Sequence, residues 1–127
     1  MNPIPRLLVA TAFCAAAAEG AQADPITDYC DQLKDRLHFC MRAYFGPDKS
    51  TDAQAECAEA PDQMEGKFQE ALDTLPAQGA VRDTLEQSYF ALALYVTSFP
   101  KVKMERTLSE EELNRLPPIV HQACDPK

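Results

Sequence analysis

The sequence predicts an all-α protein, a small antiparallel bundle of about four helices stapled by disulfides. Apolar residues recur at steps of three and four through most of the chain after residue 24, which places them along one side of each helix. Proline and glycine separate these segments, and none alternates apolar and polar residues as a half-buried strand does. The 127 residues also include five cysteines, as small exported domains often do.

Residues 1–23 have the features of a secretory signal peptide. Arg6 precedes an apolar run from Leu7 to Ala18, and residues 21–23 are Ala-Gln-Ala. A positive charge, a short apolar run and a small-x-small site are typical of such a signal. A transmembrane helix needs about 20 apolar residues, more than this run provides. We therefore predict cleavage before Asp24, a single domain over residues 24–127, and a secreted or periplasmic location.

The first helix is expected from Ile26 to Phe45. Asp24-Pro25 suits a helix start and Gly46-Pro47 a helix end. The predicted apolar stripe consists of Ile26, Cys30, Leu33, Leu37, Cys40 and Tyr44.

The second helical segment is expected to begin near Thr51, where Thr51 and Gln54 have the spacing of a capping box. Residues 53–60 are rich in Ala and Glu, and Pro61 kinks or restarts the helix. A second stripe then follows, made of Met64, Phe68, Ala71 or Leu72, and Leu75. Residues 76–79 form a loop.

The third helix is expected from Ala80 to Phe99, ending at Pro100. Its second half, from Ser88, is apolar nearly all round, which indicates the central member of a bundle. Residues 101–107 form a polar linker, the only basic segment of the domain.

A fourth helix is expected after this linker. Ser109 and Glu112 form a capping box, flanked by a hydrophobic staple of Leu108 and Leu113. This helix is expected to end at Leu116, because two prolines follow. Pro118 then opens one last turn that carries Cys124.

The helical pattern selects one disulfide pairing. Cys14 is lost with the signal peptide, which leaves Cys30, Cys40, Cys57 and Cys124. Cys40 and Cys57 lie at similar distances on either side of a turn around residue 48, so antiparallel helices bring them together, and Cys30 remains for Cys124. Metal-binding cysteines normally come in close pairs, which are absent here. We predict two disulfides and no metal.

Charge narrows the choice of partner. The net charge is -8, whereas binding to nucleic acid needs a basic surface. The same charge disfavours an anionic membrane. A cationic protein partner is the electrostatic expectation, and solubility alone is the simpler explanation.

Candidate chemical sites are weak. The window from Asp48 to Glu59 resembles an EF-hand calcium loop, but Ala53 stands where the turn needs glycine, and a capped interhelical loop is the favoured interpretation. His38 and His121 are the only histidines, and no motif places a nucleophile beside either. We therefore expect surface histidines, no cofactor and no enzymatic activity.

The sequence thus predicts an exported non-enzymatic binding protein. Its favoured form is an inhibitor or immunity-type protein that acts on a basic secreted enzyme, such as a cell-wall hydrolase. The predicted partner-binding residues are Glu56, Glu59, Asp62 and Glu65 with Glu110, Glu111 and Glu112. The alternatives are a carrier or chaperone with an apolar groove, since aromatic residues are numerous, and an accessory subunit of an exported complex.

Overall fold

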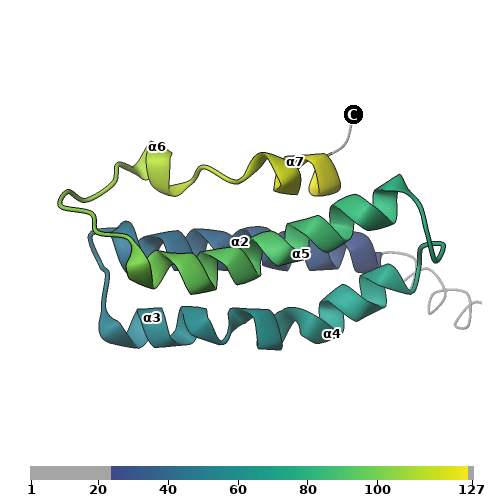
Figure 1. The fold of residues 1–127 in the computed structure, drawn as a ribbon, viewed down its shortest axis with the longest axis horizontal. Helices are drawn as coiled ribbons and strands as arrows, with labels where there is room; N and C mark the ends of the chain where they lie inside the picture. Colours follow the sequence, from purple (N-terminus) through teal and green to yellow (C-terminus); the bar gives the residue numbers. More distant parts are fainter. Residues whose placement is uncertain (1–23, 126–127) are drawn as a thin grey trace, which may run out of the picture.

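The computed structural model describes residues 24–125, and over this range the chain consists of helices joined by turns, with no strand (Figure 1). The predicted all-α class is confirmed. The predicted signal peptide lies outside the described residues. The elements are α2 (Pro25–Phe45), α3 (Thr51–Ala58), α4 (Ala60–Leu72), α5 (Ala80–Ser98), the 3₁₀ turn η1 (Phe99–Lys101), α6 (Glu110–Leu113) and α7 (Pro118–Cys124).

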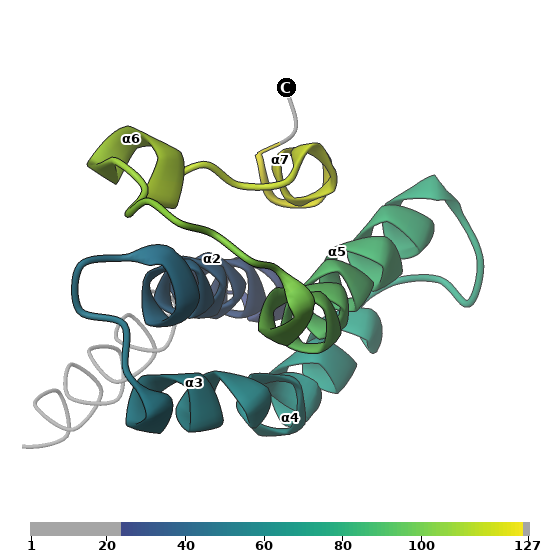
Figure 2. The ribbon, with the colours of Figure 1, turned by 60° about the vertical axis from the view of Figure 1, so that its left-hand side comes forward.

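The helices form three layers. Helices α2 and α5 lie side by side in the middle layer, α3 and α4 cover one side, and α6 and α7 cover the other (Figures 1 and 2). Helix α2 packs against α3, α4, α5, α6 and α7. It shares the central place with α5, which packs against α2, α3, α4 and α7, so the central position indicated for α5 holds and that of α2 is the addition.

The core is built on the predicted stripe of α2. Leu33, Leu37 and Cys40 are fully buried. Their neighbours in the core include Met64 from α4 and Leu92 from α5. Each large apolar side chain buried in this way stabilises the fold by about 1.5–3 kcal/mol.

Both ends of α2 are fixed by local contacts. Asp24 is the N-cap, and its carboxylate accepts a hydrogen bond of 2.8 Å from the Thr27 N–H. At the other end, the Gly46 N–H donates to the Arg42 carbonyl at 3.1 Å. A Cβ atom on Gly46 would lie 2.9 Å from that carbonyl oxygen, so glycine is needed for the close approach.

The start of α3 differs from the predicted capping box. Ser50 is the N-cap, and its hydroxyl accepts from the Ala53 N–H at 3.1 Å. The Gln54 side chain donates to the Ala43 carbonyl on α2 instead of reaching back to its own cap. The predicted restart at Pro61 is confirmed, because α4 is a separate helix with this proline in its first turn.

The span of α5 is close to the predicted one, but its burial is not. Leu85, Ser88, Ala91 and Leu92 are its buried residues. Phe90 and Leu94, in the half that the sequence indicated as apolar all round, point outward.

The predicted capping box of α6 is present, but the helix ends at Leu113 rather than Leu116. Continuing the helix would require the N–H groups of residues 117 and 118 to bind the carbonyls of Leu113 and Asn114. Both later residues are proline and have no N–H. The Arg115 N–H already donates to the Glu112 carbonyl three residues back, so α6 closes with a tighter turn. The carbonyl of Asn114 instead lies 3.1 Å from the His38 Nε2 atom.

Both predicted disulfides are confirmed. Cys40–Cys57 joins α2 to α3 and Cys30–Cys124 joins α2 to α7, with Cα–Cα distances of 5.2 and 5.6 Å. Such bonds persist in oxidising compartments outside the cytosol. No helix between residues 24 and 125 is both long and apolar enough to cross a membrane.

Candidate functional site

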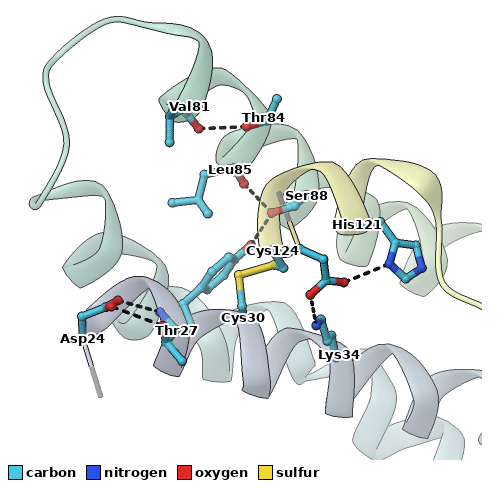
Figure 3. Close-up of a disulfide and its surroundings, with 12 residues drawn as sticks. Asp24, Thr27, Cys30, Lys34, Val81, Thr84, Leu85, Ser88, His121 and Cys124 are labelled. Carbon is cyan, nitrogen blue, oxygen red and sulfur yellow. Dashed lines mark hydrogen bonds and ion pairs between the residues drawn. A yellow bond between two sulfur atoms is a disulfide. The ribbon is translucent and has the colours of Figure 1, made fainter. Parts of the chain in front are cut away.

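A cleft of about 490 Å³ opens where the start of α2 meets the end of α7. The Cys30–Cys124 disulfide lies at this junction, with Val81 of α5 nearby (Figure 3). Asp24, Asp31 and Asp125 contribute carboxylates to its lining. The cleft is thus apolar at its disulfide and acidic around it.

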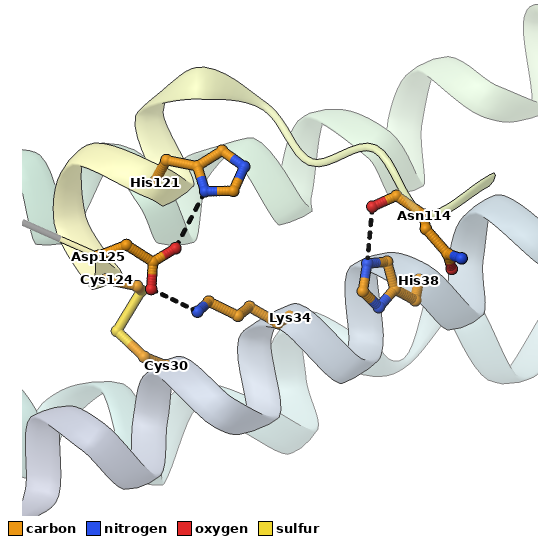
Figure 4. A network of polar contacts seen from close by, with 7 residues as sticks. All are labelled: Cys30, Lys34, His38, Asn114, His121, Cys124 and Asp125. Atoms are coloured by element: carbon orange, nitrogen blue, oxygen red, sulfur yellow. Dashed lines mark hydrogen bonds and ion pairs between the residues drawn. A yellow bond between two sulfur atoms is a disulfide. The ribbon is translucent and has the colours of Figure 1, made fainter. Parts of the chain in front are cut away.

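A row of polar contacts fastens α7 to α2 beside this cleft (Figure 4). The Asp125 carboxylate lies 2.7 Å from the Lys34 ammonium and 2.9 Å from the Nδ1 atom of His121. Hydrogen bonding from Lys34, with a smaller contribution from His121, lowers the pKa of Asp125. These contacts hold the C-terminal turn in place at the disulfide.

The two histidines have no catalytic neighbour in the described part of the chain. His38 is bonded to the backbone carbonyl of Asn114, and His121 to Asp125. His38 is half-buried and ties Asn114 to α2, whereas His121 is exposed and its contact stays within the last turn. General acid–base catalysis would need a substrate group or nucleophile within hydrogen-bonding reach, and among residues 24–125 the hydrogen-bond partners of the two histidines are a backbone carbonyl and a carboxylate.

The calcium-like window is not an ion-binding loop. Residues 51–58 form α3, so the oxygen-bearing side chains project from a helix rather than converge on one point. Within residues 24–125, no three His, Cys, Asp or Glu side chains are grouped to hold a metal ion.

The predicted partner-binding residues are divided between two layers. Glu56, Glu59, Asp62 and Glu65 are exposed on the α3–α4 layer. The three glutamates of α6, residues 110–112, lie in the α6–α7 layer on the other side of the middle helices (Figure 2). The structure therefore does not bring the two groups into one patch.

Two of the α6 glutamates serve the fold. Glu110 accepts two hydrogen bonds from the Arg42 guanidinium, at 2.9 and 3.0 Å. Glu112 is paired in the same way with Arg106 and also accepts from the Ser109 N–H. Hydrogen bonding from Arg42 lowers the pKa of Glu110, and hydrogen bonding from Arg106 lowers the pKa of Glu112 to about 2. Of the three, only Glu111 is left without an ion pair in the described region.

Tyr89 marks the seam between α4 and α5. Its ring stacks on Phe68, with ring centroids 4.3 Å apart, and its hydroxyl donates to the Pro61 carbonyl. Burial raises the pKa of Tyr89, and the negative charges of Glu65 and Asp62 raise it further. These two carboxylates therefore lie close enough to the seam for their charge to act on it.

An apolar strip lies next to this seam. Phe90 and Leu94 are 67 % and 54 % exposed on the outward side of α5. A shallow hollow of about 270 Å³ is lined by Phe90, Gln87 and the carboxylates Asp83 and Glu86. We call the combined surface the acidic–apolar face: Asp62, Glu65, Asp83, Glu86, Phe90 and Leu94.

The sequence indicates this face, although the high number of apolar residues in the second half of α5 makes the helix look apolar on all sides. Asp83, Glu86 and Gln87 identify the outward side of α5 in its first two turns. At 3.6 residues per turn, the same side continues through Phe90 and Leu94. The polar half of the helix thus shows which way these two apolar residues point.

No family model, curated protein or solved structure gives a significant match to this chain.

Proposed function

We propose that this is an exported, non-enzymatic binding protein that inhibits a basic secreted enzyme, with cell-wall hydrolases as the favoured class. One observation carries the proposal: the exposed carboxylates of the α3–α4 layer have no ion-pair partner among the described residues. They are Asp52, Glu56, Glu59, Asp62, Glu65, Glu70 and Asp73.

Several basic residues elsewhere are already engaged in ion pairs. Lys34 pairs with Asp125, Arg42 with Glu110, and Arg106 with Glu112. The one lysine of α4, Lys67, pairs with Asp28 of α2 at 2.6 Å. The exposed carboxylates of the α3–α4 layer therefore keep a negative charge that no ion pair offsets, and this charge attracts a cationic partner and accelerates its approach.

Rigidity supports an inhibitory role. The disulfides fix both α3 and α7 to α2, so the surface loses little conformational freedom on binding. A preorganised surface binds more tightly than a flexible one of equal area.

Export is the second part of the proposal. The disulfides favour an oxidising compartment, and residues 1–23 have the pattern of a cleaved signal peptide. Asp24 itself caps α2, so cleavage before Asp24 leaves the first helix complete. The intact mass of the exported protein tests this point, and retention of residues 1–23 contradicts it.

The inhibitory role is tested with the mature protein and a basic cell-wall hydrolase. Association rates are measured at low and high salt for the unmodified protein and for the double variant Glu59→Lys/Asp62→Lys. We expect the variant to associate at least ten times more slowly, because salt-screened attraction acts mainly on the association rate. Inhibition of the hydrolase is measured in parallel.

A matched control is the double variant Glu105→Lys/Glu111→Lys. It changes the net charge equally, but both glutamates are exposed outside the α3–α4 layer, and we expect a much smaller effect. If the two double variants slow association equally, the attraction depends on net charge alone and not on the α3–α4 layer. Binding without inhibition, or no binding, contradicts the inhibitory role.

The cleft at the α2–α7 junction favours a second candidate function, a carrier of small apolar ligands. Its volume of about 490 Å³ lies within the range of small-molecule sites. Val81, which lines it, is 60 % exposed. A hydrophobic fluorescent dye that binds the native protein, and binds less to the variant Val81→Asp, would support this function.

A further inference from the structure

We propose that the acidic–apolar face docks a cationic amphipathic helix of the partner. The inference rests on the proposed function and deepens it, because it names the contact residues and the chemistry of the partner segment. Phe90 and Leu94 receive the apolar side of that helix, and the surrounding carboxylates receive its lysine and arginine side chains.

The apolar strip has the geometry of a helix-binding ridge. Phe90 and Leu94 are four residues apart on α5, so they are neighbours about 6 Å apart along the helix axis. Both side chains are exposed rather than packed into the core, and Phe90 lines the hollow. Exposed aromatic residues of this kind often dominate the energy of protein interfaces.

The charges around the strip are acidic on two sides. Asp62 follows Pro61, whose carbonyl accepts from the Tyr89 hydroxyl, and Glu65 lies about one turn further along α4. Asp83 and Glu86 flank Phe90 in the hollow. Glu86 is partly balanced by Arg82, at 3.5 Å. The other three carboxylates form no ion pair among the described residues.

This charge distribution also orients the partner. Lys101 and Lys103 are exposed beyond the Leu94 end of α5. The basic side chains of the docked helix are therefore expected at the opposite end, near Asp83. From Asp83 to Leu94 the acidic–apolar face is about 17 Å long at 1.5 Å per residue, which matches about three turns of a partner helix.

The same charges argue against two other occupants of the strip. Two copies of this chain that met through the strip with their α5 helices parallel would oppose like carboxylates. A membrane with anionic lipids would be repelled for the same reason. A cationic amphipathic segment satisfies both the apolar and the acidic components.

The probe is a synthetic 18-residue Lys/Leu peptide whose leucines follow helical spacing. Its control is a scrambled peptide of equal composition and charge. We expect the amphipathic peptide to bind the mature protein, measured by calorimetry, and the scrambled peptide to bind at least ten times more weakly. Equal binding of the two would overturn the inference, because charge alone would then suffice.

Matched variants locate the site. We expect Phe90→Ser and Leu94→Ser each to weaken peptide binding about tenfold or more. Val81→Ser, which removes an equally exposed apolar side chain from another side of α5, should leave binding unchanged. Glu65→Lys is expected to weaken binding more than Glu70→Lys on the same helix. Equal effects of Phe90→Ser and Val81→Ser, or of Glu65→Lys and Glu70→Lys, would overturn the inference.

A measurement on the unmodified protein avoids any dependence on variant folding. Amide chemical shifts are compared with and without the peptide. We expect the largest changes at Glu65, Phe90 and Leu94, whereas the largest changes at Ile26 and Val81 would place the peptide in the α2–α7 cleft and overturn the inference.

The two proposals fail in different ways. A hydrolase that is inhibited with equal strength by the unmodified protein and by Phe90→Ser would contradict the docking of a helix here and leave the inhibitory role standing. If the protein binds the peptide at this face but inhibits no basic hydrolase, the docking site is supported and the inhibitory role is contradicted.

Discussion

The hydroxyl of Tyr29 lies 2.9 Å from the hydroxyl of Ser88 in the core of the fold, where both side chains are fully buried. Ser88 donates its own proton to the Leu85 carbonyl at 2.6 Å. Tyr29 is therefore the donor to Ser88. Burial raises the pKa of Tyr29, which keeps the phenol protonated and able to donate.

Replacement of Ser88 by alanine is expected to destabilise the protein by about 1–3 kcal/mol, because it leaves the buried Tyr29 hydroxyl without a partner. Tyr29→Phe should cost less, since Ser88 keeps its bond to Leu85. The double variant should then be less destabilised than the sum of the single variants. Urea unfolding of all three measures this coupling, and strict additivity would contradict the hydrogen bond.

The two disulfides are expected to contribute unequally. Cys30–Cys124 spans 94 residues and Cys40–Cys57 spans 17, for which chain-entropy arguments give about 4.7 and about 3 kcal/mol. The double variant Cys30→Ser/Cys124→Ser should therefore be the less stable of the two disulfide deletions. In this variant, the amide hydrogens of α7 should also exchange faster than those of α4. Equal exchange rates in α7 and α4 of the variant would show that α7 does not depend on its disulfide.

Glu112 gives the protein a sensitivity to acid. Its pKa in the folded state is about 2, below the ordinary value of 4.5, so its contribution to stability is complete above about pH 4.5 and is lost as the pH falls towards 2. Glu112→Gln removes the charge and keeps a side chain suited to the capping box. Unfolding midpoints between pH 6 and 2.5 should fall less steeply in this variant than in Glu111→Gln.

Two glycines are expected to respond in opposite ways to alanine. Gly66 lies within α4, and a Cβ atom there would meet nothing within 4 Å. Gly66→Ala should stabilise the protein by up to about 1 kcal/mol through helix propensity. Gly46→Ala should destabilise it by about 1–3 kcal/mol, because its Cβ would press on the Arg42 carbonyl at 2.9 Å. Thermal unfolding separates the two, and a shared direction would contradict this account.

Local features could be predicted from the sequence because their causes lie close together along the chain. The stripe of α2, the restart at Pro61 and the capping box of Ser109 each depend on residues within a few turns of one another. The Cys40–Cys57 pairing follows from one hairpin, and it leaves only Cys124 for Cys30.

Features that depend on packing between distant segments were predicted less well. The end of α6 depends on prolines that the sequence shows, but also on His38, 76 residues from Asn114. The central place of α2 could not be seen, because an apolar helix such as α5 does not indicate how many neighbours cover it. The carboxylates of residues 56–65 and 110–112 were predicted to form one binding surface, because a linear sequence does not show that they lie in different layers.

The placement of both disulfides on α2 has a consequence for how the chain matures. A chain that folds as it emerges exposes Cys30, Cys40 and Cys57 well before Cys124, which lies 94 residues beyond Cys30. At about 5–20 residues per second of synthesis, that delay is on the order of ten seconds. During this interval Cys30 is an unpaired thiol that must neither capture a neighbour nor be oxidised irreversibly. The helical separation of Cys30 from Cys40, about 15 Å along the axis, protects it from the nearest wrong partner.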